Sequence, residues 1–343
     1  MLANNRRVRF DGSTAEETFV RQLKADESSM AVLPMIDMSK MLLDAELRVA
    51  GEYKLTKGGG DDYFKVIAPG ISQMSKFLHN SDRSGVADKA ASSIVSRLIN
   101  NLAMLRQDQL SGYKLIACND RMEVDGCVSS KYVLVSNKSV YAVFRQSAEF
   151  LGSSVGMFTA ELYRREMLAV LLSKAELVNG MHVGVLCQNA ETAGRAIRVS
   201  MIYFDKQTRS WSADIFTPES RIRHVKRRQL FEKMMMAADS LQRRHKLAKK
   251  FAERLNASRK KRLPGDPKSK GWDDSLRSFL IKTAGDLPVA VERIDEVVDA
   301  VKRNQQCSWF DLYAACLKVA DTRLLSGSIS LRQLAKILID RVD

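Results

Sequence analysis

The spacing of apolar residues changes at about residue 218, and the two sides of this point predict different structures. Before it, short apolar runs alternate with turn residues. The runs lie at residues 113–118, 131–135, 166–173, 181–187, 196–204 and 211–216. Runs of this length joined by turns predict strands of an antiparallel meander. Residues 140–151 interrupt the series with helical spacing and are expected to form a helix.

After residue 218 the apolar positions follow a helical period. Neither Gly nor Pro occurs between residues 229 and 258, and the apolar residues alternate by four and by three. This spacing predicts one long helix with a single packing face. The packing residues are Leu230, Met234, Ala237, Leu241, Ala248, Phe251 and Leu255. Arg243, Lys250 and Arg254 lie about 100° further around the same helix.

The remaining segments complete a three-part organisation. Residues 1–60 are expected to be a partly flexible lead-in with a weak helical pattern at residues 38–49, and residues 88–107 show the clearest helical stripe of the first half. The core spans residues 61–262, and a Pro/Gly-containing linker separates it from helices in residues 272–343. We therefore predict an α+β fold: a central antiparallel β-meander flanked by helices, a long basic helix and a helical C-terminal part.

Positive charge is concentrated in one segment. Residues 221–262 contain sixteen Lys or Arg and three acids, so this segment has a net charge of +13 out of +15 for all 343 residues. The rest of the chain is nearly neutral. A local field of this kind attracts a polyanion, and nucleic acid is the commonest one in a cell.

A solvated surface helix is the alternative interpretation of the same charges. It predicts acids at i+4 positions, but Glu253 is the only acid between residues 241 and 262, which favours nucleic acid. Arg195 and Arg198 either pair with Glu191 in a hairpin or share a groove with the basic segment. The candidate nucleic-acid contacts are Arg195, Arg198, Arg221, Arg223, His224, Lys226, Arg227, Arg228, Arg243, Arg244, Lys246, Lys249, Lys250 and Arg254.

Other chemistry finds little support in the sequence. The four histidines have no partner at metal-ligand spacing, and no nucleophile motif is present, so we expect no cofactor, no metal and no enzymatic activity. The five cysteines form no C-x-x-C pair and are expected to be reduced, packed thiols of a cytoplasmic protein. No apolar run approaches the roughly 20 residues that cross a bilayer, so no membrane partner is expected.

Aromatic side chains ahead of the basic segment are a second candidate signal. Tyr203, Phe204, Trp211 and Phe216 lie in the predicted hairpin, where exposed rings would stack on unpaired bases. Alternate aromatics on a strand are more often part of a core, and we favour that interpretation for each ring.

Several short motifs resemble a known family. Residues 125–132 with Asn137, residues 189–199, the Arg221-Ile222-Arg223-His224 element and residues 309–315 are similar to elements of the phage- and plasmid-borne domain-of-unknown-function 932 family. A "C-x-N-G" element of that family is replaced here by residues 211–216. The resemblance implies a mobile-element protein of a bacterial cytoplasm, encoded near replication and recombination functions, and it transfers no catalytic residue.

The charge and the resemblance together give the functional expectation. We expect a nucleic-acid-binding accessory protein that contacts DNA, single-stranded DNA in particular, through the backbone in replication, recombination or strand annealing. Homo-oligomerisation is expected through the Leu230–Leu255 seam if the body does not cover it. A Mg²⁺-dependent nuclease and a virion or assembly protein are the alternatives.

Overall fold

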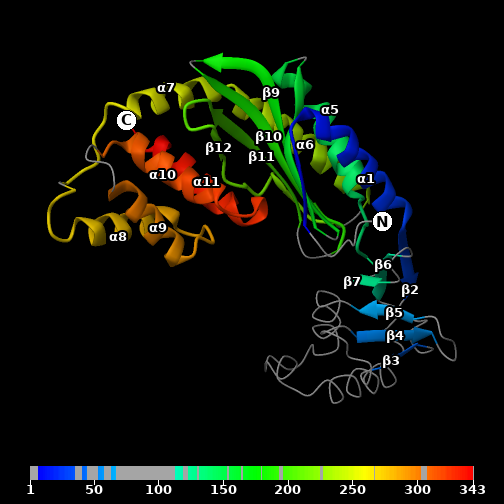
Figure 1. Ribbon diagram of the computed structural model, residues 1–343. Helices are drawn as coiled ribbons and strands as arrows, with labels where there is room; N and C mark the ends of the chain where they lie inside the picture. Colours follow the sequence, from blue (N-terminus) through cyan, green and yellow to red (C-terminus); the bar gives the residue numbers. More distant parts are fainter. Residues whose placement is uncertain are drawn as a thin grey trace.

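The computed structural model describes most of the chain in two sheets and the helices around them (Figure 1). The described residues are 7–34, 41–44, 53–57, 63–66, 113–118, 123–129, 131–152, 154–163, 165–178, 180–192, 196–224, 227–265, 267–302 and 307–342. The architecture is α+β, which confirms the predicted fold class. The helix predicted at residues 88–107 lies outside the described residues.

The main sheet contains the predicted meander from residue 166 onward, whereas the run at residues 113–118, expected to belong to the same meander, pairs in a second sheet. The order of the main sheet is β1-β8-β9-β10-β11-β12, with β13 also paired to β11, and all of its pairs are antiparallel. The strands are β1 (Val8–Asp11), β8 (Val155–Tyr163), β9 (Glu166–Val178), β10 (Met181–Ala190), β11 (Ile197–Asp205), β12 (Ser210–Ala213) and β13 (Arg221–Ile222). Gly184 allows β9 and β10 to approach closely, because a Cβ there would overlap the Leu171 carbonyl oxygen.

Helices cover both faces of this sheet (Figure 1). On one face, Val185, Cys187 and Val199 share a buried cluster with α5 (Asn137–Ser147) and α6 (Arg227–His245). On the other face, Leu186 and Ile202 pack with residues of α11 (Leu325–Asp340). Alternate side chains of each strand therefore enter separate apolar layers, as the period of two requires.

The N-terminal segment belongs to the core rather than forming the expected lead-in. β1 pairs with β8, and α1 (Glu16–Ser28) buries Phe19 and Leu23. The Phe19 ring packs edge-on against Phe10 and Tyr141, with centroids 5.3 and 5.1 Å apart. The periodicity of residues 1–30 is too short to reveal that their apolar side chains are needed to complete the sheet face.

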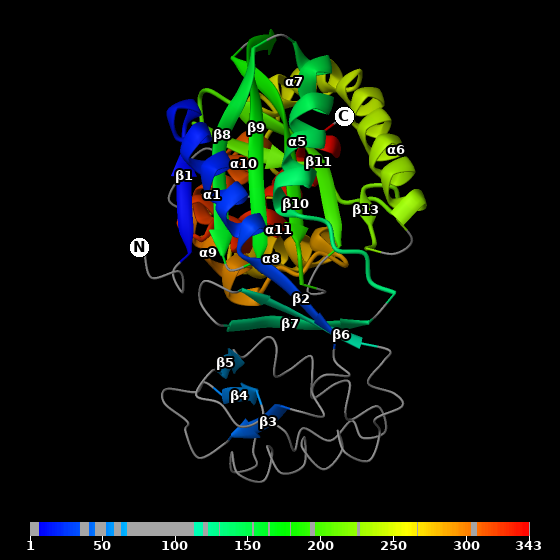
Figure 2. The same ribbon diagram turned by 90° about the vertical axis from the view of Figure 1, so that its right-hand side faces the viewer.

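A second, smaller sheet extends from one end of the main sheet (Figure 2). Its order is β2-β6-β7-β5-β4-β3, and β5 and β7 are parallel. The strands are β2 (Met30–Pro34), β3 (Met41–Asp44), β4 (Tyr53–Lys57), β5 (Tyr63–Val66), β6 (Tyr113–Cys118) and β7 (Glu123–Ser129). The weak helical pattern at residues 38–49 was misleading, since β3 pairs with β4 through residues 41–44.

The segment before α5 also differs from its prediction. Residues 131–135 were expected to form a strand, but they lead into α5, and the strand of this region is β7. Ser136 caps α5 by accepting a hydrogen bond from the Ser139 amide at 3.2 Å. A short 3₁₀ helix, Ala148–Leu151, continues α5, as the spacing of residues 140–151 predicted.

The long basic helix is two helices. After α6, a turn at residues 246–247 is closed by a hydrogen bond from the Leu247 amide to the Arg244 carbonyl, at 2.9 Å. α7 (Ala248–Ser258) then follows. The break falls where the apolar seam has Arg244 and His245 in place of apolar residues. α6 packs on β11 and β13, whereas α7 packs on α11 and on α10 (Trp309–Asp321) and still contacts β9, so the turn brings the chain to the C-terminal helices while keeping it on the sheet.

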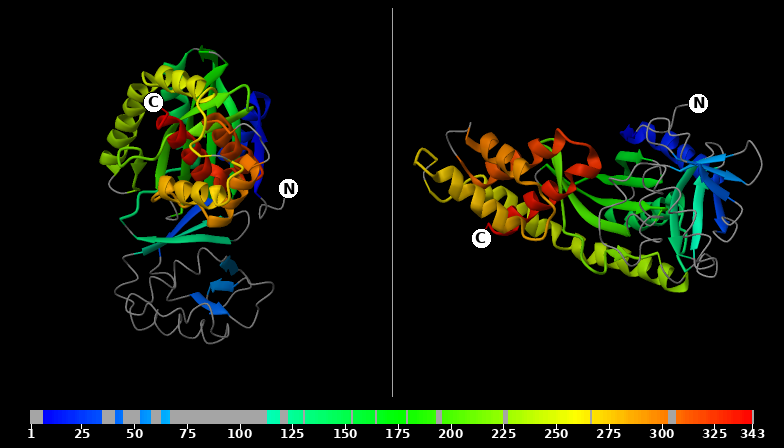
Figure 3. Two further views of the ribbon diagram at one scale, coloured as in Figure 1. Left: turned by 90° about the vertical axis from the view of Figure 1, so that its left-hand side faces the viewer. Right: turned by 90° about the horizontal axis from the view of Figure 1, so that it is seen from below.

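Among the described residues, four helices follow α7 (Figure 3). They are α8 (Trp272–Ala284), α9 (Val291–Lys302), α10 (Trp309–Asp321) and α11. Their buried residues belong to the same apolar clusters as the sheet, so these helices share the core of the main body. Arg332 of α11, 4% exposed, donates to Ser210 Oγ, the Trp211 carbonyl and Asp321, which fixes α11 to β12.

Candidate nucleic-acid interface on α6 and α7

The basic side chains of α6 and α7 fall into two groups, of which the first is held by acids of the body. Arg244 lies 3.3 Å from Asp214, and Arg254 lies 3.7 Å from Asp340. Arg259, just after α7, lies 3.5 Å from Asp205 and stacks over the Phe310 ring at 4.0 Å. These arginines attach the helices to the body, so their charge is at least partly neutralised inside the fold.

The second group consists of Arg243, Lys246, Lys249 and Lys250, which we call the cationic surface. All four side chains are exposed, and within the described part of the chain none forms an ion pair. They occupy the end of α6, the turn and the start of α7, so four positive charges lie within eight residues. Such a group repels itself, although Arg243 also interacts electrostatically with Glu219 of the fold, and an external anion would relieve the remaining repulsion.

The basic residues ahead of α6 are distributed differently. Arg198 on β11 and Arg221 on β13 are cross-strand partners, and Arg221 and Arg223 are exposed. Arg198 is half-buried, with its guanidinium 5.5 Å from the Phe216 ring centroid. Because Ile197 and Val199 point to the face covered by α6, Arg198 points to the opposite face. The sheet therefore separates Arg198 from the cationic surface.

His224 has a packing role. It is 3% exposed, its ring stacks on Tyr132 with centroids 4.9 Å apart, and its Nδ1 lies 3.2 Å from the Val133 carbonyl oxygen. Burial lowers the pKa of His224, against the opposing effect of that carbonyl, and so favours the neutral ring. A buried neutral imidazole makes no contact with an external phosphate, so His224 is not a phosphate contact.

The other candidates have no described side chain. Arg195 and Lys226 lie outside the described residues. Arg227 and Arg228 are the first residues of α6, and their side chains also lie outside the described part. The aromatic candidates belong to the core, as favoured above, since Tyr203, Trp211 and Phe216 are buried and Phe204 is partly buried.

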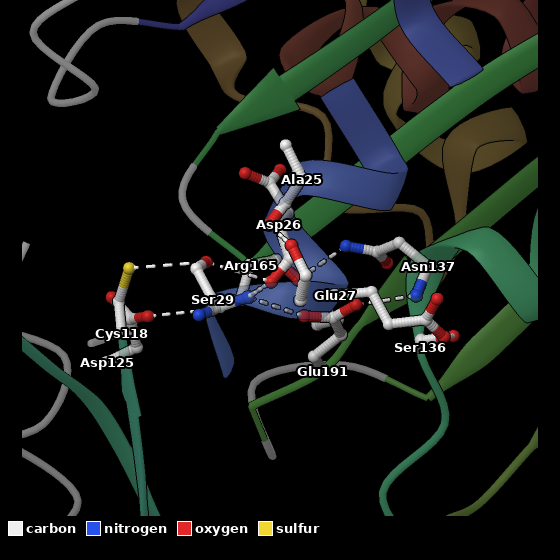
Figure 4. Close-up of polar contacts among 12 residues, drawn as sticks. Ala25, Asp26, Glu27, Ser29, Cys118, Asp125, Ser136, Asn137, Arg165 and Glu191 are labelled. Carbon is white, nitrogen blue, oxygen red and sulfur yellow. Dashed lines mark hydrogen bonds and ion pairs between the residues drawn. The ribbon is translucent and has the colours of Figure 1, made fainter. Parts of the chain in front are cut away.

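A buried ionic cluster was missed by the sequence analysis. Arg165, in the turn between β8 and β9, lies between Asp125 of β7 and Glu191 after β10 (Figure 4). Its Nε is 2.8 Å from Asp125 and one terminal nitrogen is 3.4 Å from Glu191. The same nitrogen donates to the Asp26 carbonyl at the end of α1, at 2.6 Å. We call Asp125, Asn137, Arg165 and Glu191 the arginine cluster.

Asn137 completes the arginine cluster at the start of α5. Its backbone amide donates to the Glu191 carboxylate at 2.6 Å, and its side-chain Nδ2 donates to the Arg165 carbonyl oxygen at 3.2 Å. Burial raises the pKa of Glu191 to about 7, although Arg165 and the Asn137 amide act to lower it. The cluster joins β7 of the small sheet to the main sheet, α1 and α5, so its role is to connect the two sheets.

The arginine cluster also brings together distant motif residues. Asp125, Asn137 and Glu191 come from the elements quoted for the family resemblance, and Tyr132 donates to the Ala190 and Glu191 carbonyls at 3.2 Å. The sequence gives one indication of this site, namely charged residues within or directly beside strand segments. Their spacing does not reveal which of them meet.

The nuclease alternative gains no geometric support. Within the described ranges, no group of three or more His, Cys, Asp or Glu could hold a metal ion. Asp273 and Asp274 lie in the first turn of α8, where negative charge interacts favourably with the helix dipole. The cysteines whose side chains are described form no disulfide with one another and are buried: Cys118, Cys187, Cys307 and Cys316.

Comparison with known proteins finds no match among family models, curated proteins or solved structures. Of the helices that the structure describes, none is both long enough and apolar enough to span a bilayer.

Proposed function

We propose that this protein binds nucleic acid, with DNA as the favoured ligand, through the phosphate backbone on the cationic surface. The observation that carries the proposal is the division of the basic residues. Arg244, Arg254 and Arg259 have acidic partners in the fold, whereas all four residues of the cationic surface are exposed and without an ion pair among the described residues. Lys and Arg in this state are the usual contacts for phosphate oxygens.

The binding mode follows from the side chains. Flexible lysines and one arginine on a convex helix neutralise phosphates without reading base edges, so we expect little sequence preference. Each neutralised phosphate adds roughly 0.9 to the salt slope on duplex DNA and about 0.7 on a single strand. Arg221, the cross-strand partner of Arg198, shares its face of the sheet and is left out of the contact for the same reason. Together with the family resemblance, this mode fits an accessory role in replication, recombination or strand annealing of a phage or mobile element.

A salt series with matched charge variants tests the proposal. Fluorescence anisotropy would follow binding of the full chain to labelled single-stranded and duplex DNA. The test variant is Arg243→Glu/Lys246→Glu/Lys250→Glu. The control is Lys174→Glu/Lys282→Glu/Lys318→Glu, which changes the net charge equally at exposed lysines of β9, α8 and α10.

We expect the test variant to lose most of its affinity and to bind with a salt slope smaller by about two or three. The control should keep the wild-type slope. Undetectable wild-type binding at low salt would overturn the proposal, and so would equal losses in the two variants, because the attraction would then belong to net charge rather than to this surface.

A further inference from the structure

A groove of about 370 Å³ lies between α9 and α10, and small apolar side chains line much of it. The apolar lining residues are Ala300, Ala314, Ala315 and Val319. Among the charged lining residues, Lys318 is the one base, against three acids. The groove therefore offers apolar contact and an excess of negative charge to a group from outside the fold.

Acidic side chains follow the same edge of α9. Glu292, Asp295, Glu296 and Asp299 have the spacing i, i+3, i+4 and i+7, which places them within about 100° of each other around the helix. The opposite side of α9 is buried in the core. α9 therefore presents one acidic side to solvent, beside the groove that Glu296 and Asp299 help to line.

Two of these four acids have partners in the fold, and two do not. Asp295 pairs with Arg277 of α8, and Glu296 pairs with two arginines. Glu292 and Asp299 are exposed and form no ion pair among the described residues, although Asp299 also attracts Arg277. The charge of Glu292 and most of the charge of Asp299 are therefore open to a cation from outside the fold.

The turn between α6 and α7 has the complementary shape and charge. Leu247 is 61% exposed, whereas Ala248 and Phe251 near it are buried. Arg243 precedes Leu247 by four residues and Lys250 follows it by three, and side chains at these spacings are neighbours on a helical turn. The cationic surface therefore carries one protruding apolar side chain among its positive charges.

A contact between copies has to use a surface other than the one expected from the sequence. The seam from Leu230 to Leu255, expected to mediate self-association if the body leaves it uncovered, is buried in the body. The groove and the cationic surface lie apart within one chain, because α10 packs on both α9 and α7 and Figure 1 shows it between them. A contact between these two surfaces therefore joins two copies.

We infer that the cationic surface of one copy docks on the α9–α10 groove of a second copy. Leu247 enters the groove, and Arg243, Lys246 and Lys250 face the acidic side of α9. This arrangement brings exposed cations to exposed acids and removes Leu247 from water. The contact joins two different patches, so each pair keeps one free groove and one free cationic surface, and further copies add in the same way.

The self-association is a separate use of the surface that is proposed to bind DNA, and it does not rest on that proposal. Phosphates and the groove compete for Arg243, Lys246 and Lys250, so DNA should dissociate the assembly. Glu253, exposed one turn beyond Lys250 on α7, repels both ligands alike and favours neither. The acids of α9 belong to the self-association alone, which allows the two proposals to be tested apart.

Sedimentation equilibrium of the full chain without nucleic acid tests the inference, at roughly 1 to 100 μM. The average mass should rise with concentration above the monomer mass of 38.5 kDa, and it should fall again in high salt, which screens exposed charges. The cation variant is Lys246→Gln/Leu247→Ser/Lys250→Gln, and its control at other exposed residues is Lys174→Gln/Ile281→Ser/Lys282→Gln. The groove variant is Glu292→Gln/Asp299→Asn/Ala314→Gln, and its control is Glu17→Gln/Asp274→Asn.

Each test variant should raise the dissociation constant of the assembly at least about tenfold, and the two controls should leave it unchanged. Circular dichroism checks the fold. If Ala314→Gln disturbs the fold, Glu292→Gln/Asp299→Asn serves as the groove variant, with a smaller loss. An equimolar mixture of the two test variants should form dimers and nothing larger, because one keeps an intact groove and the other keeps an intact cationic surface.

Wild-type protein that stays monomeric over the whole concentration range would overturn the inference. An assembly that either test variant leaves intact would also overturn it, as would a mixture that stays monomeric or grows beyond the dimer. The groove variant keeps the cationic surface and should bind DNA as the wild type does. Failure of the self-association is therefore distinguishable from failure of the proposed DNA binding.

Discussion

Replacing Arg165 by Met tests whether the arginine cluster joins the two sheets. Arg165 is 2% exposed and is the cation between Asp125 and Glu191, which are 3% and 1% exposed. Met has a similar length but carries no charge and donates no hydrogen bond. The substitution leaves two buried carboxylates without the cation between them and the Asp26 carbonyl without the donor at 2.6 Å.

The expected loss follows from this loss of partners. Removing one member of a buried ion pair costs about 3–5 kcal/mol, because the remaining charge stays buried. The carboxylates can escape part of this cost by binding protons, and burial already raises the pKa of Glu191. The free energy of unfolding should therefore fall by about 3–5 kcal/mol at neutral pH. The loss should shrink as the pH falls toward 5.

Urea denaturation followed by tryptophan fluorescence measures this change, since Trp211, Trp272 and Trp309 all lie in the main body. The control is Arg9→Met, which removes an exposed arginine 2.9 Å from Asp11 and should cost about 0–1 kcal/mol. If Arg165→Met costs no more than Arg9→Met, or its cost does not depend on pH, the cluster does not hold the sheets together electrostatically. If Arg165→Met prevents folding, Arg165→Lys serves as the second variant, since Lys keeps the charge but loses the planar guanidinium. Its free energy of unfolding should lie between those of the wild type and Arg165→Met.

Two further predictions concern the same core. Because the folded-state pKa of Glu191 is raised from 4.5 to about 7, the wild type should lose stability as the pH rises through this window, whereas Glu191→Gln should not. The difference between their free energies of unfolding in urea should change by up to about 3 kcal/mol across the window. A difference that does not change with pH would show that Arg165 keeps the carboxylate ionised. Gly184→Ala should lower the free energy of unfolding by about 3 kcal/mol or more in the same assay, because the new Cβ overlaps the Leu171 carbonyl oxygen and lies 2.9 Å from Ile202 Cγ1. Gly327→Ala is the control, since a Cβ at this position meets nothing within 4 Å.

The elements that were predicted correctly are those whose own pattern decides their structure. β10 and β11 alternate in sequence, and their register places Val185, Cys187 and Val199 on one face. The seam from Leu230 to Leu255 is buried as its spacing indicates. In both cases the spacing of apolar residues along the segment itself indicates which of its side chains are buried.

The predictions that were wrong concern segments whose structure is determined by contacts with residues far away in the sequence. β1 and α1 are ordered by contacts such as that of Glu16 with the Met157 amide at 3.0 Å, across 141 positions of sequence. Just before the break at residues 246–247, Arg244 reaches Asp214, thirty residues earlier. The arginine cluster likewise joins three charges from separate strands and turns, and local spacing contains no information about their meeting.

The basic residues of α6 and α7 differ in whether an acid of the fold pairs with them, and this difference says more about function than the total charge does. Arg243 and Arg244 are neighbours at the end of α6 but point about 100° apart around the helix, so they meet different surroundings. Here Arg244 turns inward to Asp214, whereas Arg243 stays exposed beside Lys246. Arg254 and Arg259 reach acids of the body in the same way, so these arginines have a structural use that needs no ligand. The cationic surface forms no ion pair among the described residues, although Arg243 interacts electrostatically with Glu219, so most of its charge is open to an anion from outside the fold.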